Sequence, residues 1–188
     1  MIDRKIILAS KSPRRSQILK EAGFDFEIKT KDIEESYPPD LPTEKVSEYL
    51  AEKKAEAFRE LLHSDEIILA ADTIVILGDV IFGKPKDATE AFEIIKKLSG
   101  NIHQVITGVC LLSKEKKKIF SGVSNVHFDE ISDTEISYYI NKFQPFDKAG
   151  AYAIQEWIGL CKIKKIEGTY SNIVGLPMRE VYQELVNF

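Results

Sequence analysis

The chain is poor in cysteine and has no long hydrophobic run. Its two cysteines, Cys110 and Cys161, each lie in an apolar segment, so we expect buried thiols and no disulfide framework. No apolar stretch approaches the length of a membrane span, and the apolar run in MIDRKIILAS is too short for a signal peptide. We therefore expect a cytoplasmic protein that has no membrane partner.

The chain also lacks a surplus of positive charge. Its formal net charge is −4, which argues against a general nucleic-acid surface but leaves room for a local basic pocket. It has no linker, repeat or low-complexity segment. Because strand and helix patterns mix along its whole length, we expect one α/β domain over residues 1–188, built as one large core or as two lobes around a cleft.

The most informative stretch is IILAADTIVILGDVIFGK, at residues 67–84. Asp72 interrupts its apolar runs, and a Gly78-Asp79 turn follows that would let residues 80–82 return as a hairpin partner. A carboxylate in such a run is costly to bury unless it is paired, coordinated or facing a cleft. Asp72 is therefore either satisfied by a neighbouring loop, or a general base or metal ligand held on a rigid strand.

The start of the first expected helix carries an unusual charge. Residues 5–9 predict a buried strand, and Ser12-Pro13 predicts a helix start with a side-chain cap followed by proline. Arg14 and Arg15 then lie at the positive end of the helix dipole, where each cation is disfavoured by roughly 0.3–1 kcal/mol. A bound anion would reverse that sign, so this turn is either a solvated basic turn or an anion site.

Two further candidates are acidic and basic side chains near residues 32–62. Glu34 and Glu35 lie in a loop, where they are either solvated or able to hold Mg²⁺, which favours one or two carboxylates with substrate phosphates. The next helix is expected from Thr43 to about Leu62, and Lys54 lies inside its apolar stripe. Lys54 either extends to the surface or points into a polar pocket between lobes.

The remaining pattern alternates helices, strands and turns. Capping boxes at Asp87 and Ser132 predict two helices. His103 and His127 have no metal-ligand spacing, and we expect both to be structural. The other expected elements are strands at 24–29, 102–112, 119–128 and 160–166, loops at 145–155 and 168–172, and a closing helix from Pro177.

Four sequence blocks are informative when taken together. They are LASKSPRR at residues 8–15, AADTIVILGDVIFGKPKDA at 70–88, LSGNIHQVITGV at 98–109, and PFDKAGAYAIQ at 145–155 followed by EGTYSNIVGLP at 167–177. In this order they resemble the Maf family of nucleoside triphosphate pyrophosphatases. The resemblance covers almost the whole chain, which makes it more specific than any single short motif.

The resemblance implies both a fold and a reaction. The fold is an elongated mixed sheet with flanking helices and two lobes around a nucleotide cleft, like that of the inosine-triphosphate pyrophosphatases. The reaction is hydrolysis of a nucleoside triphosphate between the α and β phosphates, as house-cleaning of nucleotide pools. A divalent metal is expected, Mg²⁺ first, with Mn²⁺ or Co²⁺ as alternatives. The nucleotide is the expected partner, and a homodimer is left open.

The resemblance also assigns roles to individual residues. The aspartate of the family's ADT motif is Asp72, the expected proton acceptor, and Glu35 joins it as an expected metal ligand. In the branch similar to dTTP/UTP pyrophosphatases, substrate choice is associated with Arg14, Thr73 and Gln155. The other substrate-binding residues of the family fall on Ser10, Arg15, Lys54 and Lys84.

Two departures from the family pattern bear on the choice of base. Ala153 replaces the glycine usual in AYGIQ, and Glu156-Trp157 follows where many members have Gly-Leu. Trp157 either offers a stacking face or packs in the core. The alternative enzyme is a pyrophosphatase of 7-methyl-GTP or another modified nucleotide. The alternative of another class is a nucleotide-responsive regulator of septum formation.

Overall fold

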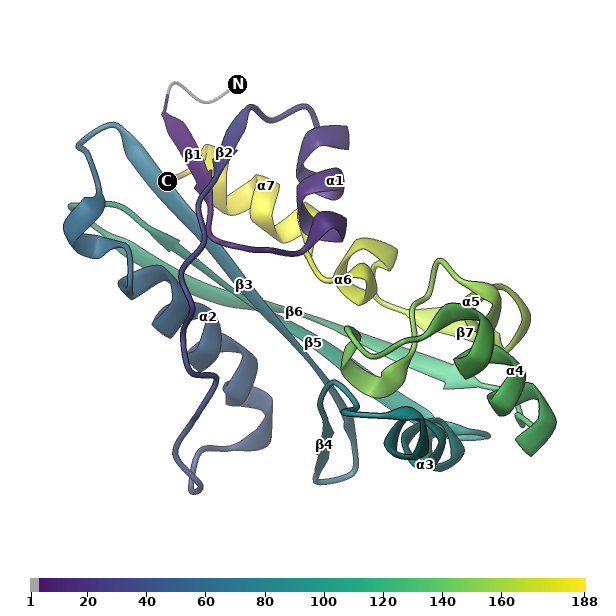
Figure 1. Cartoon of the computed structure of the whole chain (residues 1–188). Coiled ribbons are helices and arrows are strands. Elements are labelled where there is room, and N and C mark those ends of the chain that lie inside the picture. The colour runs from purple at the N-terminus through teal and green to yellow at the C-terminus, as the bar shows by residue number, and fades with distance from the viewer. Residues whose placement is uncertain (1–3) are drawn as a thin grey trace. The chain divides into compact units, whose positions relative to one another are not determined.

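The computed structural model describes residues 4–188, which form a seven-stranded mixed sheet with flanking helices. The strands are β1 (Lys5–Leu8), β2 (Phe26–Ile28), β3 (Glu66–Leu77), β4 (Val80–Phe82), β5 (Ile102–Leu112), β6 (Lys117–Phe128) and β7 (Ile163–Glu167). Their order is β2-β1-β3-β5-β6-β7, and β4 pairs with β3 (Figure 1). β1 is parallel to β2 and β3, whereas the β3–β4 and β6–β7 pairs are antiparallel. The predicted α/β class and the predicted β3–β4 hairpin are confirmed.

The helices fall into two compact units of the chain. The α-helices are α1 (Pro13–Glu21), α2 (Val46–Glu56), α3 (Ala88–Leu98), α4 (Asp133–Phe143), α5 (Trp157–Cys161), α6 (Tyr170–Val174) and α7 (Met178–Val186), and the 3₁₀ turns are η1 (Thr43–Lys45), η2 (Arg59–Leu61) and η3 (Ala149–Ala151). Unit 1 holds the described residues up to Thr73 with 107–122 and 175–188, and unit 2 holds 74–106 and 123–174. None of the helices in residues 4–188 combines the length and hydropathy that a membrane crossing needs.

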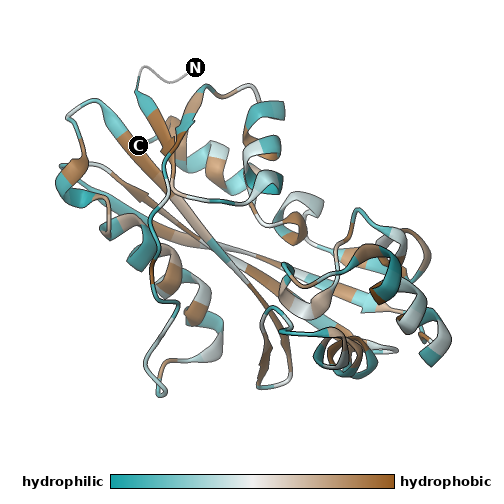
Figure 2. Cartoon of the chain, viewed as in Figure 1, coloured by the Kyte–Doolittle hydropathy of each residue, from teal (hydrophilic) through white to brown (hydrophobic). Residues whose placement is uncertain are grey.

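In unit 1 the strands have a helix layer on each face. Leu69 of β3 packs in the cluster that includes α1 and α7, and its neighbour Ala70 packs in the cluster that includes α2. Figure 2 shows hydrophobic residues along β1 and β3, and mostly hydrophilic ones along α1. Because side chains alternate between the faces of a strand, Asp72 continues the α2 face of β3, and Thr73 continues the face of α1 and α7.

In unit 2 the helices α3, α4 and α5 cover one face of the strands. Phe128 of β6 and Tyr139 of α4 are the largest fully buried side chains in the described chain. His103 of β5 is fully buried beside them, with its Nε2 atom 2.7 Å from the Tyr152 hydroxyl and its ring edge-on to Phe128. The expected structural role of His103 is therefore confirmed.

The predicted helix starts are found at α3 and α4. Ser132 caps α4 with a complete capping box, in which the Ser132 and Glu135 side chains each accept a backbone N–H. Asp87 caps α3 by accepting the Glu90 N–H. The Glu90 carboxylate accepts the N–H of Lys86, one residue before the cap, so this second box differs from the predicted one.

Three element boundaries were predicted wrongly. Thr43 lies inside η1 and does not cap α2, and the expected single helix from 43 to 62 is divided into η1, α2 and η2. The apolar stripe does not extend to the end of this segment, because Leu61 is 56% exposed.

Cys161 is exposed at the end of α5, where a strand with a buried thiol was expected. Residues 170–174 form α6 instead of a loop, and the Ile173 N–H donates to the Thr169 carbonyl.

The buried His103 makes stability depend on pH. Burial, followed by the charge of His127, lowers the pKa of His103 from 6.5 to about 3. The unfolded chain therefore binds a proton that the folded chain excludes, and stability is lost as pH falls below about 6.5. Between about pH 7.5 and about pH 5, we expect protonation of His103 in the unfolded chain to lower the free energy of unfolding by about 2 kcal/mol.

Urea unfolding across that pH range tests the prediction. His103→Gln keeps a polar partner for Tyr152 and should flatten the pH dependence. His63→Gln makes the same exchange at an exposed histidine and should leave the dependence unchanged. If the free energy of unfolding depends on pH equally in wild type and His103→Gln, the prediction is contradicted.

Candidate functional site

Lys54 links two of the acidic residues that the sequence singled out. Its ammonium group donates to Glu35 Oε1 at 2.7 Å and to Asp72 Oδ1 in a second, shorter contact. The Lys54 side chain is only 17% exposed and that of Asp72 only 11%. Lys54 therefore does not extend freely to the surface, whereas the polar pocket expected around it stays a prediction.

Three segments of unit 1 bring these groups together. Lys54 lies in the last turn of α2, Asp72 lies in the middle of β3, and Glu35 lies in the loop between β2 and η1. α2 can approach the sheet closely because β5 has glycine at position 108. A Cβ atom there would lie 2.3 Å from the backbone of Ser47.

Arg15, in the first turn of α1, is bonded to three other parts of unit 1. Its Nε donates to the Gly175 carbonyl at 2.7 Å. Its Nη1 donates to Ser10 Oγ at 3.3 Å, and its Nη2 to Thr73 Oγ1 at 3.0 Å. The Thr73 hydroxyl also lies 2.9 Å from that of Thr107. These bonds use three of the five N–H groups that a guanidinium carries.

The side chain of Ser10 fixes the turn just before α1. Ser12 stands before Pro13 as predicted, but its side chain makes no cap bond, so the predicted side-chain cap is wrong. Instead the Ser12 N–H donates to Ser10 Oγ at 3.2 Å. Ser10 is buried, and its hydroxyl thus accepts from both a backbone amide and Arg15.

The charges of this cluster nearly balance. Burial lowers the pKa of the Arg15 guanidinium, and the nearby Asp72 carboxylate opposes that shift. Arg14 lowers the pKa of Arg15 further by like-charge repulsion. Arg14, Arg15 and Lys54 together exceed Glu35 and Asp72 by one positive charge, which suits an anionic ligand.

The cluster offers few protein ligands for a metal. Within residues 4–188 no group of three or more His, Cys, Asp or Glu side chains is arranged to hold a metal ion. Glu35 and Asp72 do converge on one cationic group, the Lys54 ammonium. Two carboxylates that share a cation fit the preference of Mg²⁺ for hard oxygen ligands, with further ligands supplied by phosphates and water.

The two other predicted substrate residues belong to unit 2. Lys84 follows β4 and is exposed. Gln155 is exposed in the turn before α5, between the buried Ile154 and the partly buried Glu156. The structure thus brings Ser10, Arg15 and Thr73 into one hydrogen-bonded group of unit 1, and Glu35, Lys54 and Asp72 into a second. The charges of Asp72 and Glu35 act on Arg15 and link the two groups electrostatically. The nucleotide cleft remains a prediction.

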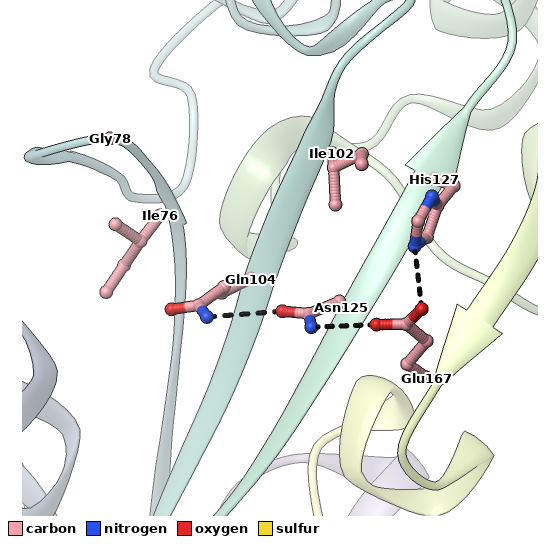
Figure 3. Close-up of a pocket in the computed structure, with 7 residues that line it drawn as sticks. All are labelled: Ile76, Gly78, Ile102, Gln104, Asn125, His127 and Glu167. Carbon is pink, nitrogen blue, oxygen red and sulfur yellow. Dashed lines mark hydrogen bonds and ion pairs between the residues drawn. The ribbon is translucent and has the colours of Figure 1, made fainter.

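Unit 2 also has a cavity of about 510 Å³ on the strand face opposite its helices (Figure 3). It contains none of the predicted site residues. Gln104 donates to Asn125 at 3.2 Å, and Asn125 donates to Glu167 at 3.1 Å. His127 Nε2 lies 3.6 Å from the same carboxylate. Gln104, Asn125 and Glu167 thus bond to one another across β5, β6 and β7, whereas His127 Nε2 is buried without a hydrogen-bond partner in the described chain.

Comparison with known proteins assigns the chain to a family. The family described as Maf-like protein matches residues 5–188. The chain belongs to the Maf family. A dTTP/UTP pyrophosphatase of Phocaeicola vulgatus is 50% identical over 182 residues, which cover 96% of this chain and 94% of that protein. One of Bacteroides thetaiotaomicron is 47% identical with the same coverage. The Staphylococcus aureus Ham1 structure is 18% identical, covering 66% of this chain and 72% of that one, with a TM-score of 0.49.

Two residues of this Maf family member were missed as candidates. Thr107 lies in one of the family's sequence blocks, but no charge or motif marked it, and only the structure shows its hydroxyl beside that of Thr73. Tyr139 had no local signal beyond its place on the inner face of a helix. Its hydroxyl bonds to the backbone of Ala153 and to the side chain of Glu156, two of the three positions at which the sequence departs from the family pattern.

Arg15→Lys should destabilise unit 1 although it keeps the charge. A single ammonium group cannot replace a planar guanidinium group that donates hydrogen bonds to three separate segments. Buried acceptors left without a partner cost about 1–3 kcal/mol. We expect a loss of that size in the free energy of urea unfolding.

Arg179→Lys is the matched control, because Arg179 is largely exposed on α7 and pairs with Glu180. It should change stability by less than about 0.5 kcal/mol. The prediction fails if the two variants are equally stable.

Proposed function

We propose that this protein hydrolyses nucleoside triphosphates, dTTP and UTP first, to the monophosphate and pyrophosphate. The observation that carries the proposal is the cluster of Glu35, Lys54 and Asp72 beside Arg15, with its surplus of positive charge. The curated relatives that match nearly the whole chain are named dTTP/UTP pyrophosphatase. We further propose that residues 1–188 act as one Maf domain in the cytoplasm, on the nucleotide pool.

The basic side chains are proposed to bind the triphosphate. Arg15 keeps two N–H groups beyond its three bonds to protein atoms, and Arg14 precedes it on the same turn. Planar guanidinium groups bind phosphate oxygens in pairs, while a lysine acts as a point charge. We assign Lys54 and the exposed Lys84 to the second role. Ser10 supports the turn that carries both arginines.

Asp72 is proposed to accept the proton of the attacking water. The water oxygen forms a new bond to phosphorus, the bridging bond between the α and β phosphates breaks, and pyrophosphate leaves. Asp72 suits this role because β3 and the Lys54 ammonium hold its carboxylate in place. A carboxylate that is fixed before the reaction needs no reorganisation in the transition state.

A divalent cation, Mg²⁺ first, is proposed to be held by Glu35 and Asp72 together with substrate phosphates. Such an ion neutralises phosphate charge and polarises the bond that breaks. The Lys54 ammonium, which joins these two carboxylates, would remain beside them as a point charge for the phosphates.

The base is proposed to be read by Gln155, with Arg14 and Thr73 as supporting residues. The amide of Gln155 carries both a donor and an acceptor, which match the edge of uracil or thymine. The Thr73 hydroxyl contacts Arg15 and Thr107, so we propose that Thr73 acts by positioning Arg15. Trp157 packs against Tyr138 and the core of unit 2. This contact supports a role for Trp157 in core packing over a role as a stacking surface for the base.

Asp72→Asn should lower kcat for pyrophosphate release by about 10²–10⁴-fold, the usual cost of removing a general base. The assay measures pyrophosphate from UTP with Mg²⁺. Asp79→Asn makes the same exchange in the exposed β3–β4 turn and should leave kcat unchanged. A folded Asp72→Asn enzyme with near-normal turnover would refute the assignment. Binding without multiple turnover in the wild type would favour the nucleotide-responsive regulator.

UTP and dTTP should be cleaved before CTP, GTP and 7-methyl-GTP when all five compete at equal concentration. A site built on hydrogen bonds rejects a mismatched base, because its own polar groups are left unpaired. Gln155→Met should remove this preference, whereas Gln183→Met, at an exposed position of α7, should keep it. Preferential cleavage of 7-methyl-GTP by the wild type would promote the alternative enzyme.

A further inference from the structure

The turn that presents Gln155 is closed by a ring of hydrogen bonds. The Ala153 N–H donates to the Tyr139 hydroxyl at 3.0 Å, and that hydroxyl donates to Glu156 Oε2 at 2.5 Å. The Glu156 N–H then returns to the Ala153 carbonyl at 3.1 Å. We call these three residues the Tyr139 clamp. The clamp encloses only Ile154 and Gln155.

The clamp is anchored to a rigid helix. Tyr139 is fully buried on the inner face of α4, and its ring stacks on Phe143 at 5.1 Å. The complete capping box at Ser132 fixes the first turn of the same helix. Burial, followed by the bond to Glu156, raises the pKa of Tyr139, so its hydroxyl remains a donor. Figure 1 shows α4 and α5 beside each other, and both contribute to the core of unit 2.

Glu156 directs its carboxylate to the clamp instead of to its own helix. It is the N-cap residue of α5, where an acidic side chain often accepts a backbone N–H, yet it makes no such bond. Its Oε2 atom accepts from Tyr139, and its Oε1 atom lies 3.4 Å from Lys148 Nζ. Lys148 is itself buried and also donates to Asp147 at 2.7 Å. Both oxygens of the carboxylate are therefore held.

The enclosed dipeptide has little freedom apart from the Gln155 side chain. Ile154 is buried, and its carbonyl lies against Gly159 so closely that a Cβ atom at Gly159 would be 1.8 Å from it. Tyr152, just before the clamp, is held by its hydroxyl to His103. Gln155 is the exposed residue of this segment, so the fixed backbone sets where its amide can point.

We propose that Tyr139 and Glu156 are positioning residues that set base selectivity by fixing the backbone of Gln155. This inference rests on the proposed function, in which Gln155 reads the base. It also gives a role to Glu156, which departs from the family pattern: Glu156 supplies the carboxylate that orients the Tyr139 hydroxyl. The N–H that donates to this hydroxyl is a backbone group, which any residue except proline would supply at position 153. The usual glycine at position 156 would have no carboxylate for this role.

The central test is Tyr139→Phe, which removes one hydroxyl and keeps the ring. The kcat/KM ratio of UTP to CTP should fall about 10- to 100-fold, as expected when a reading group is displaced by about 1 Å. The KM for UTP should rise more than kcat falls, because the catalytic cluster of unit 1 is untouched. Tyr138→Phe is the matched control: Tyr138 is the neighbouring residue, and its hydroxyl accepts from Lys142 outside the clamp. It should keep the wild-type ratio.

Two variants at Glu156 separate positioning from simple stability. Glu156→Gln keeps an oxygen that can accept from Tyr139 and should retain most of the selectivity. Glu156→Ala removes the acceptor and should lose as much selectivity as Tyr139→Phe. This pair also serves if Tyr139→Phe does not fold, because Glu156 is only partly buried. Equal selectivity in Glu156→Gln and Glu156→Ala would overturn the proposal.

Amide exchange measures the clamp without reference to activity. The Ala153 N–H should exchange faster with solvent in Tyr139→Phe than in Tyr138→Phe. A Tyr139→Phe enzyme with a lower Tm but an unchanged UTP to CTP ratio would make the tyrosine merely structural and overturn the clamp alone. A wild type that releases no pyrophosphate from any nucleotide would overturn the proposed function, and the clamp proposal with it.

Discussion

One ammonium group holds the proposed site of unit 1 together. Lys54 bridges Glu35 and Asp72, and without it two carboxylates would repel each other where Asp72 is almost out of contact with water. The bridge forms only if α2 lies close to the sheet, and Gly108 permits this because it has no side chain facing the Ser47 backbone. The packing of small residues in unit 1 therefore determines the charge geometry of the site. A larger residue at position 108 would displace Lys54 without touching any charged group.

Much of the fold could be predicted because its signals are local. The apolar runs on either side of Asp72 and the Gly78-Asp79 turn predict β3 and its hairpin, and the structure has both. Ser132 with Glu135 is a complete capping box within four residues, and it forms as predicted. Short-range patterns of this kind depend on backbone geometry alone. They were misleading at residues 160–162, where the end of α5 and a bend stand in place of the expected strand.

The site could be predicted only in part, because its decisive contacts join distant residues. Lys54 was a candidate from its place on an apolar stripe, but its pairing with Asp72 depends on how α2 packs on β3. Nothing near Thr107 indicated that its hydroxyl would lie beside that of Thr73. The role of Tyr139 was equally hidden, because a tyrosine on the inner face of a helix is consistent with core packing alone. The family resemblance supplied roles for residues, whereas the structure supplied the bonds that orient them.

Asp72 and Thr73 are neighbours in sequence, yet they serve opposite faces of β3. Asp72 meets Lys54 of α2, and Thr73 meets Arg15 of α1. A strand exchanges its two faces when it shifts by one residue. Insertion or deletion of a single residue between Ile67 and Asp72 would therefore turn the carboxylate towards α1 and the hydroxyl towards α2. Evolution can thus vary the apolar side chains of this strand in size, but it cannot change the number of residues between them.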